Sequence, residues 1–388
     1  MLLPNHPRRA FRLSELIIVI VIGAITLGLF VTGTATTCHY GSTRMQCANN
    51  MRQIVLASHT YAAEFVNDLP PLTSDMAKPN NDSYNGNIFF TLLPYMEEER
   101  VFANALQVSP SATWYALIAP SAARDSGSTI SLPGYPLLCS SNFKTFLCPN
   151  DQTIVENSYS ANQTSGTATA PGAGVAWAAC SYAANYQVFG TENDFVSGKT
   201  GNYCGPKYAF DKIPDGRSYI VFFGEQISAC GSGAGNLWAY PGIGNYSGPE
   251  YTSNALGGLP PLGIGNSIIN RPGLTNSWAW APVFANNNSK YGFTAGGNGG
   301  SIFEFNKAHP DDTPLTAPYA AGEFWDAPPQ EEKTAAACDK SRLQSFHKGC
   351  VSLGIGDGSV RYVTPLISQA TWYSAIMPAD GTPLGSDW

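Results

Sequence analysis

Residues 8–31 read RRAFRLSELIIVIVIGAITLGLFV, and this segment decides how the chain is organised. From Leu16 to Val31 it is apolar apart from a few small residues, and it approaches the ~20 residues that cross a bilayer. Three arginines lie just before the apolar run, and basic residues favour the cytoplasmic side. We therefore predict a short polar segment at residues 1–10 and a single membrane helix within residues 11–32. The N-terminus would lie in the cytoplasm and the C-terminal domain outside the cytoplasmic membrane.

A cleaved secretory signal is the alternative reading of this segment. Such a signal ends in small residues, and Thr34-Ala35-Thr36 fits that description. It leaves Glu15 unexplained, because a charge in hydrocarbon costs about 2.5–3.5 kcal/mol unless it has a partner. Glu15 therefore favours a retained helix whose carboxylate is paired.

The composition indicates a folded, loop-rich body. Apolar residues make up 44% of the 388 residues and charged residues only 13%, with 39 Gly and 28 Pro. An apolar share of this size supports a real core, and the many turn formers favour a β-rich fold with long connections. The net charge of −7 gives no basic surface for nucleic acid, so we expect no nucleic-acid partner.

Beyond the membrane segment we predict an α+β fold, in which the long N-terminal helix packs on a β-rich globular body. Apolar residues recur at helical spacing after Met45, so an amphipathic helix should occupy residues 33–69. Glycines and threonines should weaken the helix around residues 32–43, so that it continues in broken form, and Pro70 should stop it near Asp68. The exported domain then covers residues 70–388, with a loop-rich insertion at about 150–335.

A β-hairpin is predicted at about residues 346–363. Apolar residues alternate on both sides of Asp357-Gly358, and Asp-Gly between alternating apolar residues is a strong hairpin signal. Turn chemistry alone explains Asp357 and Gly358. Glu225 ends another apolar run, Val221–Gly224, where a carboxylate would satisfy buried backbone donors.

Nine scattered cysteines fit disulfides in an exported domain. The pairs closest in sequence are the candidates, although sequence leaves their connectivity open. The alternative is that the cysteines are buried free thiols that pack as small apolar residues. The three candidate pairs are Cys38/Cys47, Cys139/Cys148 and Cys338/Cys350.

Catalytic motifs are absent from the sequence, so we expect no enzyme and no cofactor. The histidines are far apart and lack metal-ligand spacing, and no nucleophile elbow or P-loop occurs. His59 should be a packed, hydrogen-bonded residue of the amphipathic helix. For His347 we expect a structural role, bonding Asp357 or nearby backbone; a ligand or metal contact, and catalysis, remain alternatives.

Aromatic residues within 238–280 suggest a second type of function. Residues of this kind, flanked by Gly- and Asn-rich loops, can form platforms for sugar rings or for another protein. The alternative is that they fill the core. The residues concerned are Trp238, Tyr240, Trp278 and Trp280.

Ala10-Phe11-Arg12-Leu13-Ser14-Glu15, followed by an apolar helix, resembles the type IV prepilin motif of small residue, Phe, x, Leu, x, Glu. The resemblance implies that a prepilin peptidase cuts between Ala10 and Phe11 and that the new amino group is methylated. It also implies that Glu15 pairs with the Phe11 amine of a neighbouring subunit. The implied partners are that peptidase, other pilin-like subunits or copies of the chain, and the cytoplasmic membrane.

A second resemblance begins at the C-terminus, where nine residues separate His347 from Asp357-Gly358. This spacing is similar to the signature of a bacterial family of unknown function whose members carry prepilin-type N-termini. The resemblance implies an α+β body built on the N-terminal helix and brings no established activity. Further phrases in the same order are Cys47-x-Asn49-Asn50-x-x-Gln53-Ile54, Phe146-x-Cys148-Pro149-x-Asp151, Ser181-Tyr182-x-x-Asn185-Tyr186, and Asp215-Gly216 through Phe223-Gly224-Glu225.

Taken together, these patterns predict a pilin- or pseudopilin-like structural protein of the cell envelope, assembled into a filament or a secretion complex. The alternative is a membrane-anchored binding module for glycans or surface partners.

Overall fold

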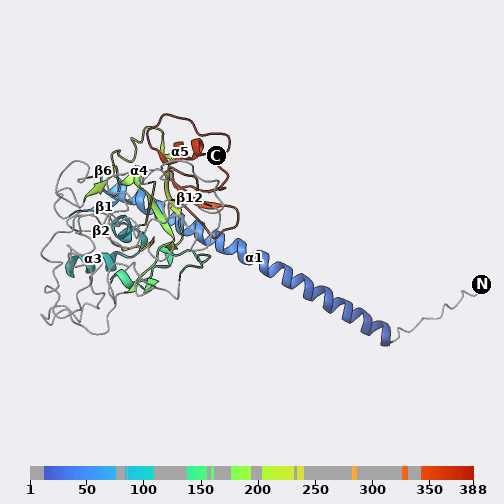
Figure 1. The fold of residues 1–388 in the computed structure, drawn as a ribbon. Coiled ribbons are helices and arrows are strands. Elements are labelled where there is room, and N and C mark those ends of the chain that lie inside the picture. Colours follow the sequence, from blue (N-terminus) through green and yellow to red (C-terminus); the bar gives the residue numbers. More distant parts are fainter. Residues whose placement is uncertain are drawn as a thin grey trace, which may run out of the picture. The chain divides into compact units, whose positions relative to one another are not determined.

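The computed structural model describes the N-terminal helix from Leu13 and several parts of the body (Figure 1). The chain divides into two compact units, Met1–Gln46 and Cys47–Trp388. The second unit contains the core and the candidate site. The described residues are 13–75, 84, 86–108, 138–154, 159–160, 176–193, 203–230, 234–239, 282–285, 326–330 and 342–388.

Helix α1 runs unbroken from Leu13 to Glu64, 52 residues in all. The predicted interruption around residues 32–43 is therefore wrong. Glycine in a helix interior costs only about 1 kcal/mol relative to alanine, and no proline occurs between residues 11 and 69 to break the backbone. The helix ends before Val66 and Asn67, whose φ angles of 53° and 70° are left-handed.

Among the described residues, no helix combines the length and the hydropathy that crossing a bilayer requires.

The main sheet has five strands in the order β11-β5-β8-β12-β13. Only β11 and β5 pair in parallel, and the other neighbours are antiparallel. Every residue of β8 and β12 is buried, which fits their central positions. The strands are β11 (Val283–Phe284), β5 (Tyr182–Asn185), β8 (Val221–Glu225), β12 (Val351–Ile355) and β13 (Val360–Val363).

The predicted hairpin is confirmed as β12 and β13. Ile355 N–H donates to Ser359 O at 2.9 Å, and Gly358 N–H donates to Ile355 O at 2.9 Å. Gly358 has a φ of 93°, a conformation that side chains other than hydrogen disfavour. Asp357 Oδ1 accepts from Ser359 N–H at 2.9 Å and so holds the turn.

The two faces of β12 contact different helices. Val351, Leu353 and Ile355 belong to a core cluster with Trp372, on helix α5 (Gln369–Ile376). On the other face α1 approaches closely, because a Cβ added to Gly354 would lie 2.4 Å from Cγ2 of Val55. The sheet therefore lies between α5 and the body portion of α1.

Short elements complete the fold and confirm the α+β part of the predicted fold class. Asn87, Asn185 and Ser368 cap α2, α4 and α5 by accepting hydrogen bonds from backbone N–H groups in the first turn. The remaining described elements are β1 (Thr73–Ser74), β2 (Gly86–Asn87), α2 (Ile88–Thr91), η1 (Leu93–Met96), α3 (Glu99–Val108), η4 (Leu138–Ser140), η5 (Lys144–Phe146), β3 (Tyr159–Ser160), β4 (Ala176–Trp177), α4 (Tyr186–Phe189), β6 (Glu192–Asn193), β7 (Cys204–Gly205), η6 (Arg217–Tyr219), β9 (Ala229–Cys230) and β10 (Ala234–Gly235).

Candidate functional site

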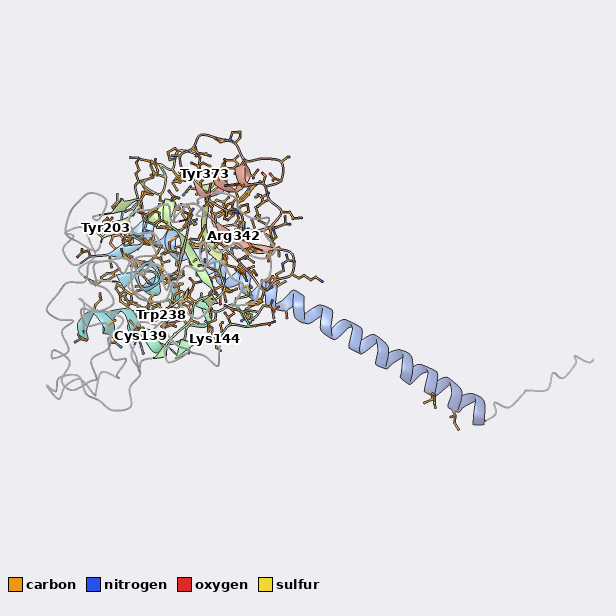
Figure 2. All side chains as sticks on the ribbon, in the orientation of Figure 1. Cys139, Lys144, Tyr203, Trp238, Arg342 and Tyr373 are labelled. Carbon is orange, nitrogen blue, oxygen red and sulfur yellow. A yellow bond between two sulfur atoms is a disulfide. The ribbon has the colours of Figure 1, made fainter. Side chains whose placement is uncertain are left out.

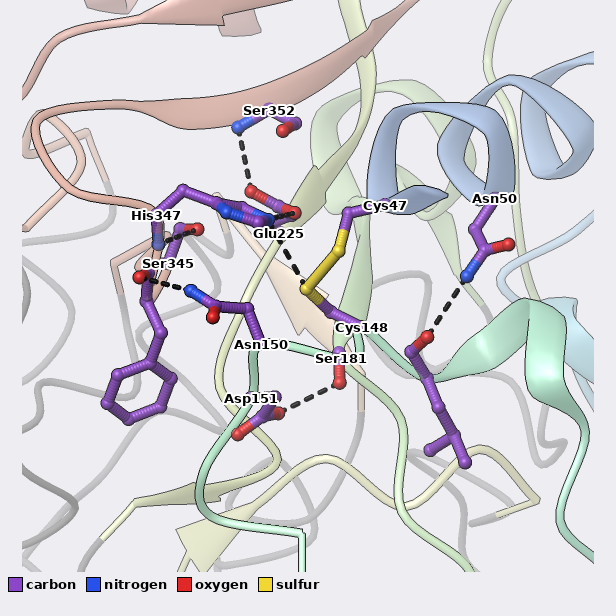
Figure 3. The surroundings of a disulfide bond; sticks show 12 residues. Cys47, Asn50, Cys148, Asn150, Asp151, Ser181, Glu225, Ser345, His347 and Ser352 are labelled. Carbon is purple, nitrogen blue, oxygen red and sulfur yellow. Dashed lines mark hydrogen bonds and ion pairs between the residues drawn. A yellow bond between two sulfur atoms is a disulfide. The ribbon is translucent and has the colours of Figure 1, made fainter. Parts of the chain in front are cut away.

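Four chemically reactive side chains from four separate segments meet inside the body (Figure 3). Cys47 lies on α1, Cys148 follows η5, Glu225 ends β8, and His347 precedes β12. Their relative exposures are 0%, 4%, 2% and 6%, so water has little access to any of them. One sulfur, nitrogen or oxygen atom from each lies within 4.8 Å of the other three.

A disulfide joins Cys47 to Cys148 across a sequence separation of 101 residues. The predicted pairs Cys38/Cys47 and Cys139/Cys148 are therefore wrong. Closeness in sequence was a poor guide to the pairing, because the partner of Cys47 lies in a distant loop that the fold brings next to α1.

Two other cysteines of the predicted pairs, Cys139 and Cys350, are buried. Cys139 is a free thiol, whereas the Cys338/Cys350 pair stays a prediction. Burial raises the pKa of Cys139 to about 12, so this thiol stays protonated at neutral pH. Cys338 and the side chain of Cys38 lie outside the described residues.

His347 lies between the disulfide and a buried carboxylate. Its Nε2 is 3.4 Å from Cys148 Sγ and 3.4 Å from Glu225 Oε1. A local hydrogen bond holds the backbone that positions the ring: His347 N–H donates to Ser345 Oγ at 3.0 Å. In the described part of the chain no hydrogen bond joins His347 to Asp357, so of the two expected structural partners Asp357 is not one, and the structural role of His347 stays a prediction.

Glu225 uses its two carboxylate oxygens differently. Oε2 accepts from Ser352 N–H at 2.9 Å, which confirms that this carboxylate satisfies a buried backbone donor. Oε1 is buried and receives no hydrogen bond from the described residues, although it lies at ion-pair distance from His347. A buried carboxylate oxygen with no donor is costly, so it calls for an explanation.

Side-chain amides hold the four segments together. Asn50, one turn after Cys47 on α1, donates through Nδ2 to Leu147 O at 3.0 Å and to Lys144 O at 3.2 Å. Asn150 donates through Nδ2 to Phe346 O, which ties the Cys148 loop to the His347 loop. These contacts fix the positions of the sulfur and imidazole groups.

Tyr182 closes the site beside Cys47. Its hydroxyl donates to Cys47 O at 3.3 Å. Burial, together with the nearby charge of Glu225, raises the pKa of Tyr182 well above its usual value of 10.0. Tyr182 is therefore a neutral hydrogen-bond donor.

Asp151 anchors the loop that carries Cys148. Its carboxylate accepts five hydrogen bonds, from Thr153 N–H and Oγ1, Ser181 Oγ, and Ser228 N–H and Oγ. A carboxylate this fully satisfied is structural, and it sets the conformation of the chain just after Cys148.

The remaining sequence-predicted residues do not join the site. Asp357 and Gly358 form the hairpin turn, and Ser359 and Ser218 hydrogen bonds lower the pKa of Asp357 even though burial works to raise it. The expectation for His59 is confirmed, since its Nε2 hydrogen-bonds Gly356 O at 3.0 Å.

Trp238, labelled in Figure 2, belongs to the hydrophobic core. It is 0% exposed and donates through Nε1 to Ser141 O at 2.8 Å, so it is no surface platform for a ligand. The other platform residues, Tyr240, Trp278 and Trp280, lie outside the described residues. So do Ala10, Phe11 and the side chain of Glu15.

The arrangement of the four-residue cluster limits its chemistry. Two sulfurs, an imidazole nitrogen and a carboxylate oxygen form a set with hardly any exposed surface. Such a set can staple segments or hold a small ion. Sequence reasoning singled out each of these residues separately and missed that they meet, since no local spacing connects four distant segments.

Comparisons with known proteins place the chain in a family. No curated protein and no solved structure matches it significantly. Residues 43–369 match a family described as "Protein of unknown function (DUF1559)", and all four residues of the cluster fall inside this range. Since the match covers well over half of the sequence, the chain belongs to this family.

Proposed function

We propose that the protein is a pilin-like structural subunit that is held in the cytoplasmic membrane by residues 11–32 and presents its body outside. One observation carries the proposal: the prepilin-like motif from Ala10 to Glu15 leads directly into the apolar run that ends at Val31. The side chains of residues 22–41 lie outside the described residues, so the membrane span rests on the sequence.

The long helix supports this proposal. The 52 residues of α1 are more than the ~20 helical residues that cross a bilayer core. Its later residues Met51 and Val55 are fully buried in the body, so one continuous helix serves both as the anchor and as a core element. A disulfide at Cys47 suits an oxidising compartment outside the cytoplasm.

Assembly would depend on Glu15. Its carboxylate, placed near the start of the apolar run, would pair with the amino group of Phe11 in a neighbouring subunit after processing. Pairing removes the cost of an isolated charge in hydrocarbon, about 2.5–3.5 kcal/mol, and so favours side-by-side packing of subunits.

Mass spectrometry of the N-terminal peptide from the membrane fraction tests the processing step. The expected mature chain begins at N-methylated Phe11. A chain that begins near residue 36 would instead mean a released, secreted protein, and an intact N-terminus would mean a plain signal anchor. Either of these results would refute the prepilin-like mechanism.

The variant Glu15→Ala tests assembly. Export and membrane insertion should be unchanged, while recovery of cross-linked or sheared multimers should fall by at least about tenfold, since about 2.5 kcal/mol of pairing would be lost. Ser14→Ala is the matched control and should assemble normally. Equal multimer recovery from Glu15→Ala and the control would exclude this assembly mechanism.

A further inference from the structure

We propose that, when Cys47 and Cys148 are reduced, the cluster of Cys47, Cys148, Glu225 and His347 binds one zinc ion. This inference concerns the body alone and does not depend on the pilin-like proposal. It gives the buried cluster two exclusive states, a disulfide and a metal centre.

Two of the spacings between ligand atoms already suit a tetrahedral ion. Zinc binds sulfur at about 2.3 Å and nitrogen or oxygen at about 2.0–2.2 Å, so neighbouring ligand atoms around it lie about 3.3–3.8 Å apart. His347 Nε2 lies 3.4 Å from both Cys148 Sγ and Glu225 Oε1. All four ligand atoms lie within 4.8 Å of one another, and breaking the disulfide frees the two sulfur atoms to separate to coordination distance.

Glu225 supplies a second, independent indication. Its Oε1 is buried, receives no hydrogen bond from the described residues, and lies beside Nε2 of His347. A cation between these atoms would satisfy that oxygen. The other oxygen is already oriented by Ser352 N–H, and ligating carboxylates are commonly held by such hydrogen bonds.

The four residues match the ligand preference of zinc. Thiolate and imidazole ligands together favour zinc over magnesium or calcium, which prefer oxygen alone. Four protein ligands in a buried site leave no open coordination position, which is typical of structural rather than catalytic zinc. The ion would hold α1, the Cys148 loop, β8 and the His347 loop together, as the disulfide does for two of them.

The two chemical steps balance as follows. A dithiol reductant exchanges with the Cys47–Cys148 disulfide, giving two protein thiols and an oxidised, disulfide-bonded reductant. Zn²⁺ then binds both sulfurs as thiolates and releases two protons to solvent, while His347 binds as the neutral imidazole. In reoxidation a disulfide oxidant exchanges with the two thiolates, takes up two protons and leaves as two thiols, so the Cys47–Cys148 bond re-forms and the ion is released.

Zinc content in the two redox states tests the proposal. Full-length protein in detergent is prepared either oxidised or reduced with a phosphine, which becomes the phosphine oxide by taking oxygen from water. Both samples are dialysed against micromolar Zn²⁺, and the bound metal is measured by elemental mass spectrometry. We expect one zinc per reduced chain and none per oxidised chain; equal content in both states would overturn the proposal.

Variants identify the ligands. Loss of an outer partner weakens metal sites by about 10- to 100-fold, so removing a ligand in Cys47→Ser or His347→Gln should weaken zinc binding by about 100-fold or more. Glu225→Gln should weaken it as well. Cys139→Ser is the matched control, since it removes a buried thiol outside the cluster, and it should leave zinc binding unchanged.

Cobalt(II) gives a readout that needs no variant. In the reduced, unaltered protein, Co²⁺ should produce the intense visible bands of a four-coordinate site with thiolate-to-metal charge transfer. Zinc should abolish these bands by displacement. Their absence, or zinc binding that is lost in Cys139→Ser but kept in His347→Gln, would refute the assignment.

Discussion

Replacing both Cys47 and Cys148 with serine should destabilise the body strongly. The disulfide closes a loop of 101 residues, and a cross-link across about 100 residues lowers the entropy of the unfolded chain by the equivalent of about 4.7 kcal/mol at 25 °C. Measured losses for native disulfides in small domains run about 2–5 kcal/mol, because the unfolded chain keeps residual structure. We therefore expect a loss of about 3–5 kcal/mol in the free energy of unfolding.

Urea unfolding with a chelator present measures this loss and excludes any contribution of bound metal. The oxidised protein, the phosphine-reduced protein and the double serine variant are compared, with Cys139→Ser as the control for replacing a buried thiol. The reduced protein and the double variant should shift together, and reductant should not shift the double variant further. A loss below about 1 kcal/mol in the double variant would refute the loop-closure reasoning.

Three further perturbations test the packing around the site. Asp151→Asn should lower the free energy of unfolding by about 3 kcal/mol, because an amide cannot accept all five hydrogen bonds. The exposed control Asp68→Asn should change it by less than about 0.5 kcal/mol, and urea unfolding of both variants measures the difference. Gly354→Ala should cost about 1–3 kcal/mol in thermal unfolding, since its Cβ would lie 2.4 Å from Val55 Cγ2, and an unchanged midpoint would contradict that close approach. Burial lowers the pKa of His59 below 6.5, so the unfolded chain binds the proton more readily and the free energy of unfolding should fall as the pH drops below 6.5. His59→Gln should reduce this dependence of stability on pH. An equal slope in both proteins would show that His59 is not responsible.

Local signals predicted the local structure well. The Asp357-Gly358 turn, its flanking strands and the backbone role of Glu225 each depend on a few neighbouring residues or on one strand end. The continuity of α1 was missed because glycine and threonine propensities are weak terms, of about 1 kcal/mol or less, that helix continuity can absorb.

The candidate site was beyond sequence reasoning for a geometric reason. The spacing of histidines along the sequence can reveal metal ligands only when they share one helix or loop. His347 instead meets Glu225 and two cysteines that come from three other segments. The disulfide partner of Cys47 likewise depends on how the Cys148 loop folds back, held by Asn50. Trp238 shows the same limit, because nothing in its flanking residues indicates whether the indole faces the core or the solvent.

The position of the disulfide on α1 has a mechanical consequence. Cys47 on α1 is fully buried, and its sulfur bonds the loop around Cys148. Tension applied along α1 would therefore enter the body through a covalent bond at that point. Sliding residues 47–64 out of the core would require that bond to break or the Cys148 loop to follow. If α1 is pulled, this covalent cross-link should let the body resist extraction of the helix at forces that non-covalent packing alone would not withstand.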